Sequence, residues 1–99
     1  MKNGIYKFDE IKSRLAPVFK ANGVRSAVLF GSYAKNAATE KSDVDLLVDS
    51  GLKGLNFVGL TECVREALDK EVDVIDVRYV KKGSLVDNEI RKTGVLIYG

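Results

Sequence analysis

The chain contains no histidine and only one cysteine, Cys63. The missing histidine excludes imidazole general bases, His-ligated zinc and Ser-His-Asp triads. A single thiol allows neither an intrachain disulfide nor a cysteine zinc cluster. Any chemistry must therefore come from carboxylates, hydroxyls, Lys and Arg side chains, backbone amides and a hard metal ion. We expect Cys63 to be a small buried apolar residue beside Leu60 and Val64, in a cytoplasmic protein with a reduced thiol.

An excess of either charge is also missing, because 16 Lys and Arg residues face 14 Asp and Glu residues. This balance lacks the basic excess of a protein that binds nucleic acid directly. The sequence has no apolar signal core and no apolar run approaching ~20 residues, so no contact with a membrane is expected. Its 99 residues predict one soluble domain over residues 1–99, with one small core and no room for a separate substrate domain.

The apolar spacing predicts an α/β (α+β) fold, with helices packed on a small mixed sheet. Helices are expected over residues 5–22 and 56–69, and again between a Ser84 cap and Gly94. A short helix is expected over residues 33–38, and Pro17 is expected to kink the first helix or to start a second one. The expected strands are Ser26 to Phe30, Asp43 to Val48, Val72 to Val77 and Val95 to Tyr98.

Connection lengths predict how the first three strands run. The link from Ser32 to Ser42 is too short for a parallel crossover, so those two strands should be antiparallel. The longer link that follows the second strand has room for a helix and favours a right-handed parallel crossover. Gly31-Ser32, the Asp43 region and Asp73 should then meet at one end of the sheet.

Asp43 and Asp45 stand two residues apart, so they should project from one face of their strand. Two carboxylates this close repel each other, and a divalent cation between them removes that repulsion. Oxygen ligands alone favour Mg²⁺, with Mn²⁺ as the alternative. Asp73 is expected to supply the third carboxylate, with Asp76 as a weaker candidate. The set predicts catalytic and metal-binding residues Asp43, Asp45 and Asp73 for two-metal phosphoryl or nucleotidyl transfer.

Small and polar residues at the same end are candidates for binding the phosphates of a nucleotide. Gly31 allows close backbone approach, and Ser32 offers a hydroxyl and an amide. Lys35 supplies a point charge for a phosphate, and Ser42 precedes the first carboxylate. Taken singly, these features also fit a turn, a surface lysine and a solvated strand face. Their convergence at one end of the sheet favours a site.

Gly31-Ser32, ten further residues and Asp43-Val44-Asp45 form the GS-x10-DxD pattern, which resembles the DNA polymerase β-like nucleotidyltransferase superfamily. The run LFGSYAKNAATEKSDVDLLV is similar to that of the minimal nucleotidyltransferases (MNT proteins). The segments VDVIDV and RKTGVLIYG resemble the family's third-carboxylate strand and closing strand. The sequence departs from the family's usual GSxARG at two positions. Lys35 replaces the Arg and contacts phosphate less directionally. Asn36 replaces the Gly and tolerates a left-handed backbone better than most residues.

The resemblance implies an MntA-like antitoxin that transfers AMP from ATP to a tyrosine hydroxyl of a partner HEPN-type ribonuclease toxin, with Mg²⁺. Asp43, Asp45 and Asp73 would carry the metal and the chemistry, and Gly31 and Ser32 would hold the triphosphate. A hetero-oligomer with the toxin is implied. Two alternatives stay open: an antitoxin that acts by binding alone, and a small-molecule nucleotidyltransferase of the aminoglycoside-modifying type. The second needs an acceptor pocket from a partner or dimer, because the chain has no room for an added domain.

Overall fold

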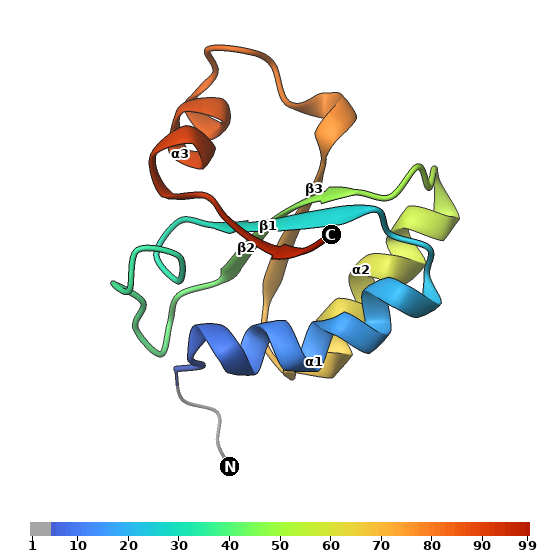
Figure 1. Ribbon diagram of the computed structural model, residues 1–99, viewed down its shortest axis with the longest axis horizontal. Coiled ribbons are helices and arrows are strands. Elements are labelled where there is room, and N and C mark those ends of the chain that lie inside the picture. The colour runs from blue at the N-terminus through green and yellow to red at the C-terminus, as the bar shows by residue number, and fades with distance from the viewer. Residues whose placement is uncertain (1–4) are drawn as a thin grey trace.

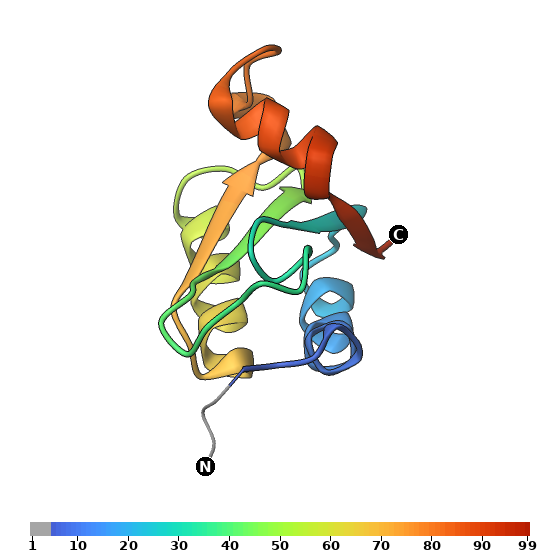
Figure 2. The ribbon, with the colours of Figure 1, turned by 90° about the vertical axis from the view of Figure 1, so that its left-hand side faces the viewer.

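The computed structural model describes residues 5–99 as a four-stranded mixed sheet with two long helices on one face and a shorter helix on the other (Figures 1 and 2). The strands are β1 (Ser26–Phe30), β2 (Val44–Asp49), β3 (Val72–Asp76) and β4 (Val95–Tyr98), in the spatial order β3-β2-β1-β4. β1 is antiparallel to β2 and β4, and β2 is parallel to β3. The expected mixed sheet, including these strand directions, is confirmed.

Helix α1 (Phe8–Ala21) buries Ile11, Leu15 and Phe19, which recur every four residues and face the sheet. Its first turn is supported by the Lys7 N–H, which donates to Glu10 Oε1 over 2.8 Å. The helix continues through Pro17 as one element, so a second helix starting at Pro17, one of the two expected alternatives, does not form. Pro17 is exposed, and the rest of the apolar stripe holds both halves of the helix against the core.

Helix α2 (Leu55–Leu68) connects β2 to β3 and buries Leu60, Val64 and Leu68 against the same face of the sheet. These residues meet buried β2 side chains, with Val44, Leu46 and Val48 alternating against half-buried neighbours. The prediction that Cys63 is buried is wrong, because it stands one position off this stripe and is exposed. No helix within residues 5–99 is long and apolar enough to span a membrane.

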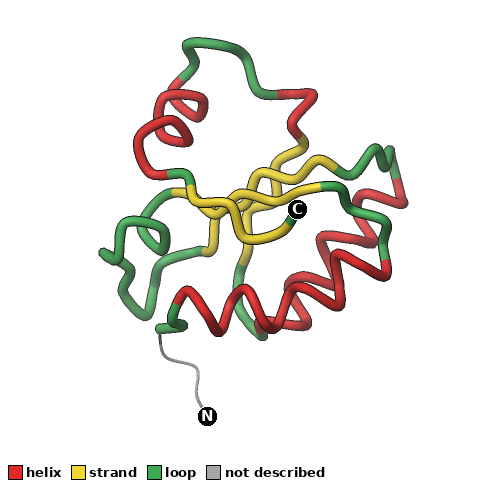
Figure 3. The backbone as a smooth tube through the Cα atoms, in the orientation of Figure 1, coloured by secondary structure: helices red, strands yellow, loops and turns green. Residues whose placement is uncertain are grey.

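The segment between β1 and β2 is a loop (Figure 3), so the short helix expected over residues 33–38 is wrong. The chain begins to turn helically where the Gly31 carbonyl accepts the Ala34 and Lys35 amides. Asn36 then adopts a left-handed conformation, with φ +58°, which prevents the turn from continuing. Tyr33 is buried in this loop and packs against the core, so its ring does not form part of the exposed surface.

The strand β3 ends at Asp76, one residue before the predicted end, because Asp76 turns the chain. Its carboxylate accepts the Arg78 N–H over 2.9 Å and caps the short 3₁₀ helix η1 (Val77–Tyr79). Helix α3 (Leu85–Thr93) follows on the opposite side of the sheet from α1 and α2 (Figure 1). As predicted, the Ser84 hydroxyl caps it by accepting the Asp87 N–H over 3.1 Å.

Candidate active site

Strand pairing brings the candidate carboxylates together with the end of β1. Asp45, the second residue of β2, is paired with Phe30 on one side and with Asp73 on the other. Gly31 follows Phe30, and Asp43 immediately precedes β2. The convergence expected from connection lengths is therefore present in the fold. Asp43 and Asp73 are exposed, whereas Asp45 is half-buried.

Asp45 is the carboxylate most affected by this arrangement. Its burial and the negative charges of Asp73, Asp43 and Glu89 raise the pKa of Asp45 from its usual 3.8 to about 6. Within residues 5–99 the three predicted carboxylates take part in no ion pair. The cluster therefore holds negative charge that only a proton or an added cation can offset.

Position 31 requires glycine because of a close contact as well as its backbone conformation. Its φ of +77° lies in the left-handed region, and a Cβ added here would collide with Asp45 Oδ2. Gly31 thus allows the turn after β1 to lie directly against the Asp45 carboxylate. Ser32, the next residue, is half-buried at the same place.

Lys35 and Ser42 are both engaged within the chain. Lys35 Nζ lies 3.5 Å from Glu89 Oε2 of α3, and both side chains are substantially exposed. The Ser42 hydroxyl accepts the Thr39 N–H over 2.9 Å and closes the turn before Asp43. Ser42 therefore stabilises the turn that leads into β2, and the Lys35 side chain links the loop to α3.

Asp76, the weaker candidate for the third carboxylate, lies away from the cluster. It is paired with Val48, three positions along the sheet from Asp73, and is only 4% exposed. The Arg78 guanidinium donates to Asp76 Oδ2 over 2.5 and 3.0 Å, and this pairing lowers the pKa of Asp76. A buried, fully engaged carboxylate of this kind supports the fold, which leaves Asp73 as the candidate.

Two residues of α3 also reach the site, although they were not predicted from the sequence. Glu89 is the third carboxylate whose negative charge acts on Asp45, after Asp73 and Asp43. The Thr93 hydroxyl accepts the Gly31 N–H over 2.9 Å. Their spacing of four places them on one helix face, a signal visible in the sequence. Periodicity alone does not say that this face meets the end of β1.

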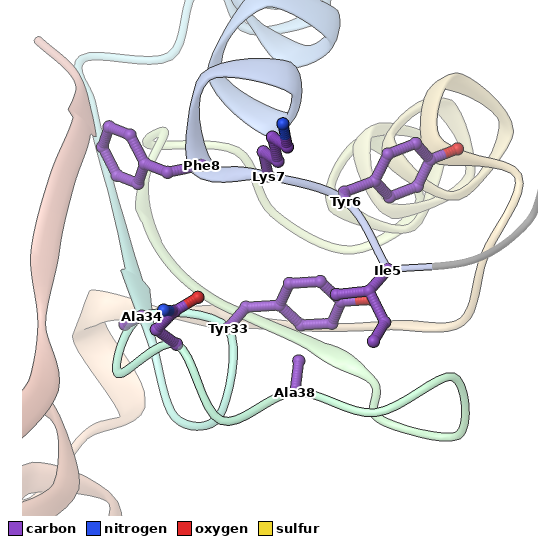
Figure 4. A pocket seen from close by; sticks show the side chains of 8 residues that line it. Ile5, Tyr6, Lys7, Phe8, Tyr33, Ala34 and Ala38 are labelled. Atoms are coloured by element: carbon purple, nitrogen blue, oxygen red, sulfur yellow. The ribbon is translucent and has the colours of Figure 1, made fainter.

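The reverse side of the Ser32–Ala38 loop lines a cavity of about 450 Å³ (Figure 4). Its other wall is the segment before and at the start of α1, including Tyr6 and Phe8. Tyr33 fills part of the space between them, and its buried hydroxyl has no hydrogen-bond partner within the described residues. The loop is thus lined from behind by aromatic side chains, and Gly31, which precedes it, lies against the Asp45 carboxylate.

A family model described as "Polymerase beta, Nucleotidyltransferase" matches residues 13–99. The chain belongs to this nucleotidyltransferase family. The predicted family and fold are therefore confirmed, and the chain contains a nucleotidyltransferase domain.

Curated relatives of this nucleotidyltransferase include archaeal proteins. A Methanocaldococcus jannaschii protein, provisionally named a protein adenylyltransferase, is 44% identical over 69 residues, which cover 68% of this chain and 74% of the relative. The protein adenylyltransferase MntA of Thermococcus cleftensis is 40% identical over 63 residues, covering 62% of this chain and 64% of MntA.

Solved structures share the fold of this nucleotidyltransferase. A chain in a crystal structure of a toxin–antitoxin with AMP-PNP has a TM-score of 0.75 and 23% identity, covering 89% of this chain and 73% of the other. A chain in the complex of tri-AMPylated Shewanella oneidensis HEPN toxin with MNT antitoxin has a TM-score of 0.70 and 21% identity, covering 93% and 72%. At these identities the likeness shows the fold alone.

The donor chemistry of the nucleotidyltransferase site fits a divalent cation. Its side chains offer carboxylate oxygens only, which suit Mg²⁺ or Mn²⁺. Across residues 5–99, no three acidic or thiol side chains are gathered tightly enough to form a complete ion site alone. This is compatible with Mg²⁺, which is usually held by one or two carboxylates together with water and substrate phosphates.

Proposed function

We propose that this nucleotidyltransferase is an antitoxin that transfers AMP from ATP to a tyrosine hydroxyl of a partner HEPN-type ribonuclease toxin. The observation that carries the proposal is the pairing of Asp45 with Asp73 beside the Gly31-Ser32 turn. The adenylyltransferase names of relatives that are 40% and 44% identical support this reaction. We also infer that the chain acts in the cytoplasm, where ATP and Mg²⁺ are available.

Each predicted residue has a part in the proposed site. Asp43, Asp45 and Asp73 would hold Mg²⁺, with two ions in the full site, and bound Mg²⁺ would neutralise phosphate charge during transfer. Gly31 lets the backbone approach the phosphates, and Ser32 offers its amide and hydroxyl to them. Lys35 would add a positive charge after leaving Glu89, and Ser42 orients the turn that delivers Asp43. The exposed side chains of Asp43 and Asp73 suit a macromolecular acceptor, because a large partner can reach them.

Label transfer tests the proposal directly. The protein is incubated with Mg²⁺, ATP labelled at the α-phosphate and a HEPN-type protein encoded beside it. Label should appear on a tyrosine of the partner and should be lost when Mg²⁺ is chelated. Absence of label from every nucleoside triphosphate offered would refute the enzymatic function.

Binding alone is the second candidate, and the Lys35–Glu89 pair favours it, because this lysine is already engaged. The variant that replaces both Asp43 and Asp45 by Ala separates the two functions. A folded double variant that protects cells from the toxin as well as the wild type acts by binding. Loss of protection by a folded double variant supports transfer.

A further inference from the structure

Helix α3 holds the Gly31 turn through a single hydroxyl group. Thr93 Oγ1 accepts the Gly31 N–H over 2.9 Å and donates its own proton to the Glu89 carbonyl over 2.8 Å. The hydroxyl has one proton, and the helix uses it, so a lone pair faces the Gly31 amide. One turn earlier on α3, Glu89 contacts Lys35 of the same loop.

The sheet places Thr93 at this position. β4 pairs with β1 in the antiparallel register Leu29 opposite Val95. Continued two residues beyond Leu29, to one residue past the end of β1, the same register brings Gly31 opposite Thr93. The side chain therefore takes the place of a strand partner where α3 ends and β4 begins.

The Gly31 peptide is the part of the turn that contacts the proposed reaction site. A Cβ at Gly31 would collide with Asp45 Oδ2, so this backbone lies against the carboxylate. The Gly31 carbonyl accepts the Ala34 and Lys35 amides at 3.1 Å each. With its N–H held by Thr93, the peptide is fixed on both sides. Ser32 directly follows it.

We infer that Thr93 is a positioning residue for nucleoside triphosphate binding, an inference that rests on the proposed function. It acts through Gly31: the hydroxyl holds the turn at the distance from Asp45 at which Ser32 and Lys35 face the phosphates. Gly31 is buried, so removal of the hydroxyl leaves its amide without an acceptor. The turn then moves to find another partner, and the phosphate-binding groups move with it.

The test is calorimetric binding of a non-hydrolysable ATP analogue, with Mg²⁺, to four proteins. They are the wild type, Thr93→Val, Thr93→Ser and the matched control Thr61→Val. Thr61 of α2 also donates to the carbonyl four residues earlier, over 3.2 Å, and is also half-buried. It belongs to α2, which packs on the opposite face of the sheet from α3 (Figure 1). Hydrogen exchange of the Gly31 amide is measured in the same proteins.

Thr93→Val should weaken analogue binding about tenfold and speed exchange at Gly31, because a buried amide loses its acceptor. Thr93→Ser should bind within about twofold of wild type, and Thr61→Val should bind as the wild type does. If Thr93→Val fails to fold, Thr93→Ala takes its place. Wild-type affinity in a folded variant without the hydroxyl overturns the inference alone. A wild type that binds no analogue overturns the proposed function as well.

Discussion

Asp73 of β3 lies directly beside Asp45 of β2 in the parallel pairing of the two strands. Parallel neighbours in register project to the same face, so the two carboxylates share one side of the sheet. Together with burial and the charge of Asp43, this placement raises the pKa of Asp45 to about 6. The site is thus built from groups that repel one another until a cation or a proton is added.

This repulsion makes the metal-free protein sensitive to pH through Asp45. The folded pKa of about 6 lies above the ordinary value of 3.8, so the folded state binds more protons between these values. Stability contributed by Asp45 is therefore present at low pH and is lost as the pH rises from about 4 to about 6. Without metal at neutral pH, Asp45→Asn should melt a few degrees above wild type. Thermal unfolding across this range measures the difference.

Mg²⁺ should reverse the order of the melting temperatures of the wild type and Asp45→Asn. At neutral pH the ion should raise the melting temperature of the wild type and leave that of Asp45→Asn nearly unchanged. Near pH 5 the gain should shrink, because protons compete for the same oxygens. An equal gain in both proteins at neutral pH would place the ion elsewhere.

Gly31→Ala should damage the site more than it damages the fold. The left-handed backbone strains any side chain by about 1 kcal/mol, and the new Cβ also pushes against Asp45 Oδ2. Gly23→Ala is the matched control, because Gly23 has φ +70° with nothing within 4 Å of an added Cβ. Both variants should lose similar stability in denaturant. Only Gly31→Ala should weaken binding of the ATP analogue, by at least about tenfold, and equal binding by the two would refute the contact.

Asp76→Asn should destabilise the protein and spare its activity. Arg78 lowers the pKa of the buried Asp76 carboxyl, so this pair contributes stability above the usual pKa and loses it as the pH falls through the folded value. At neutral pH the substitution should cost about 2 kcal/mol, the range of hydrogen bonds to charged groups. Urea unfolding measures the cost, and the difference from wild type should shrink in acid.

Glu89→Gln should improve nucleotide binding. Glu89 holds Lys35 and adds negative charge beside Asp45, and both effects oppose an incoming triphosphate. The affinity for the ATP analogue should rise about two- to fivefold, as expected from an exposed ion pair. The gain should be smaller in a Lys35→Ala background. Glu66→Gln, on the exposed face of α2, is the control and should change nothing.

The strands and the two long helices were predictable because their apolar residues repeat with the period of each element. Ile11, Leu15 and Phe19 recur every four residues, and β2 alternates between buried and half-buried positions. The clustering of Asp45 and Asp73 followed from connection length and crossover handedness. These local rules hold here because each strand buries one face against a single core, and this burial fixes the register in which the strand pairs.

The loop after Ser32 and the role of α3 were not predictable in the same way. Asn36 takes a left-handed conformation that ends the turn, although its neighbours favour a helix. Helix α3 has no fully buried residue, so its periodicity does not fix where it packs. The contacts of Thr93 and Glu89 with Gly31 and Lys35 depend on that packing. They become visible only when β4 is paired with β1.

The central claim is that Asp73, paired with Asp45, is the third carboxylate of a nucleotidyl-transfer site. Intact mass spectrometry of the HEPN-type partner, after incubation with ATP and Mg²⁺, tests it most directly. Asp73→Asn is compared with wild type and with Asp76→Asn, each shown to be folded. We expect AMP on the partner with wild type and Asp76→Asn, and none with Asp73→Asn. AMP transfer by Asp73→Asn at the wild-type rate would contradict it.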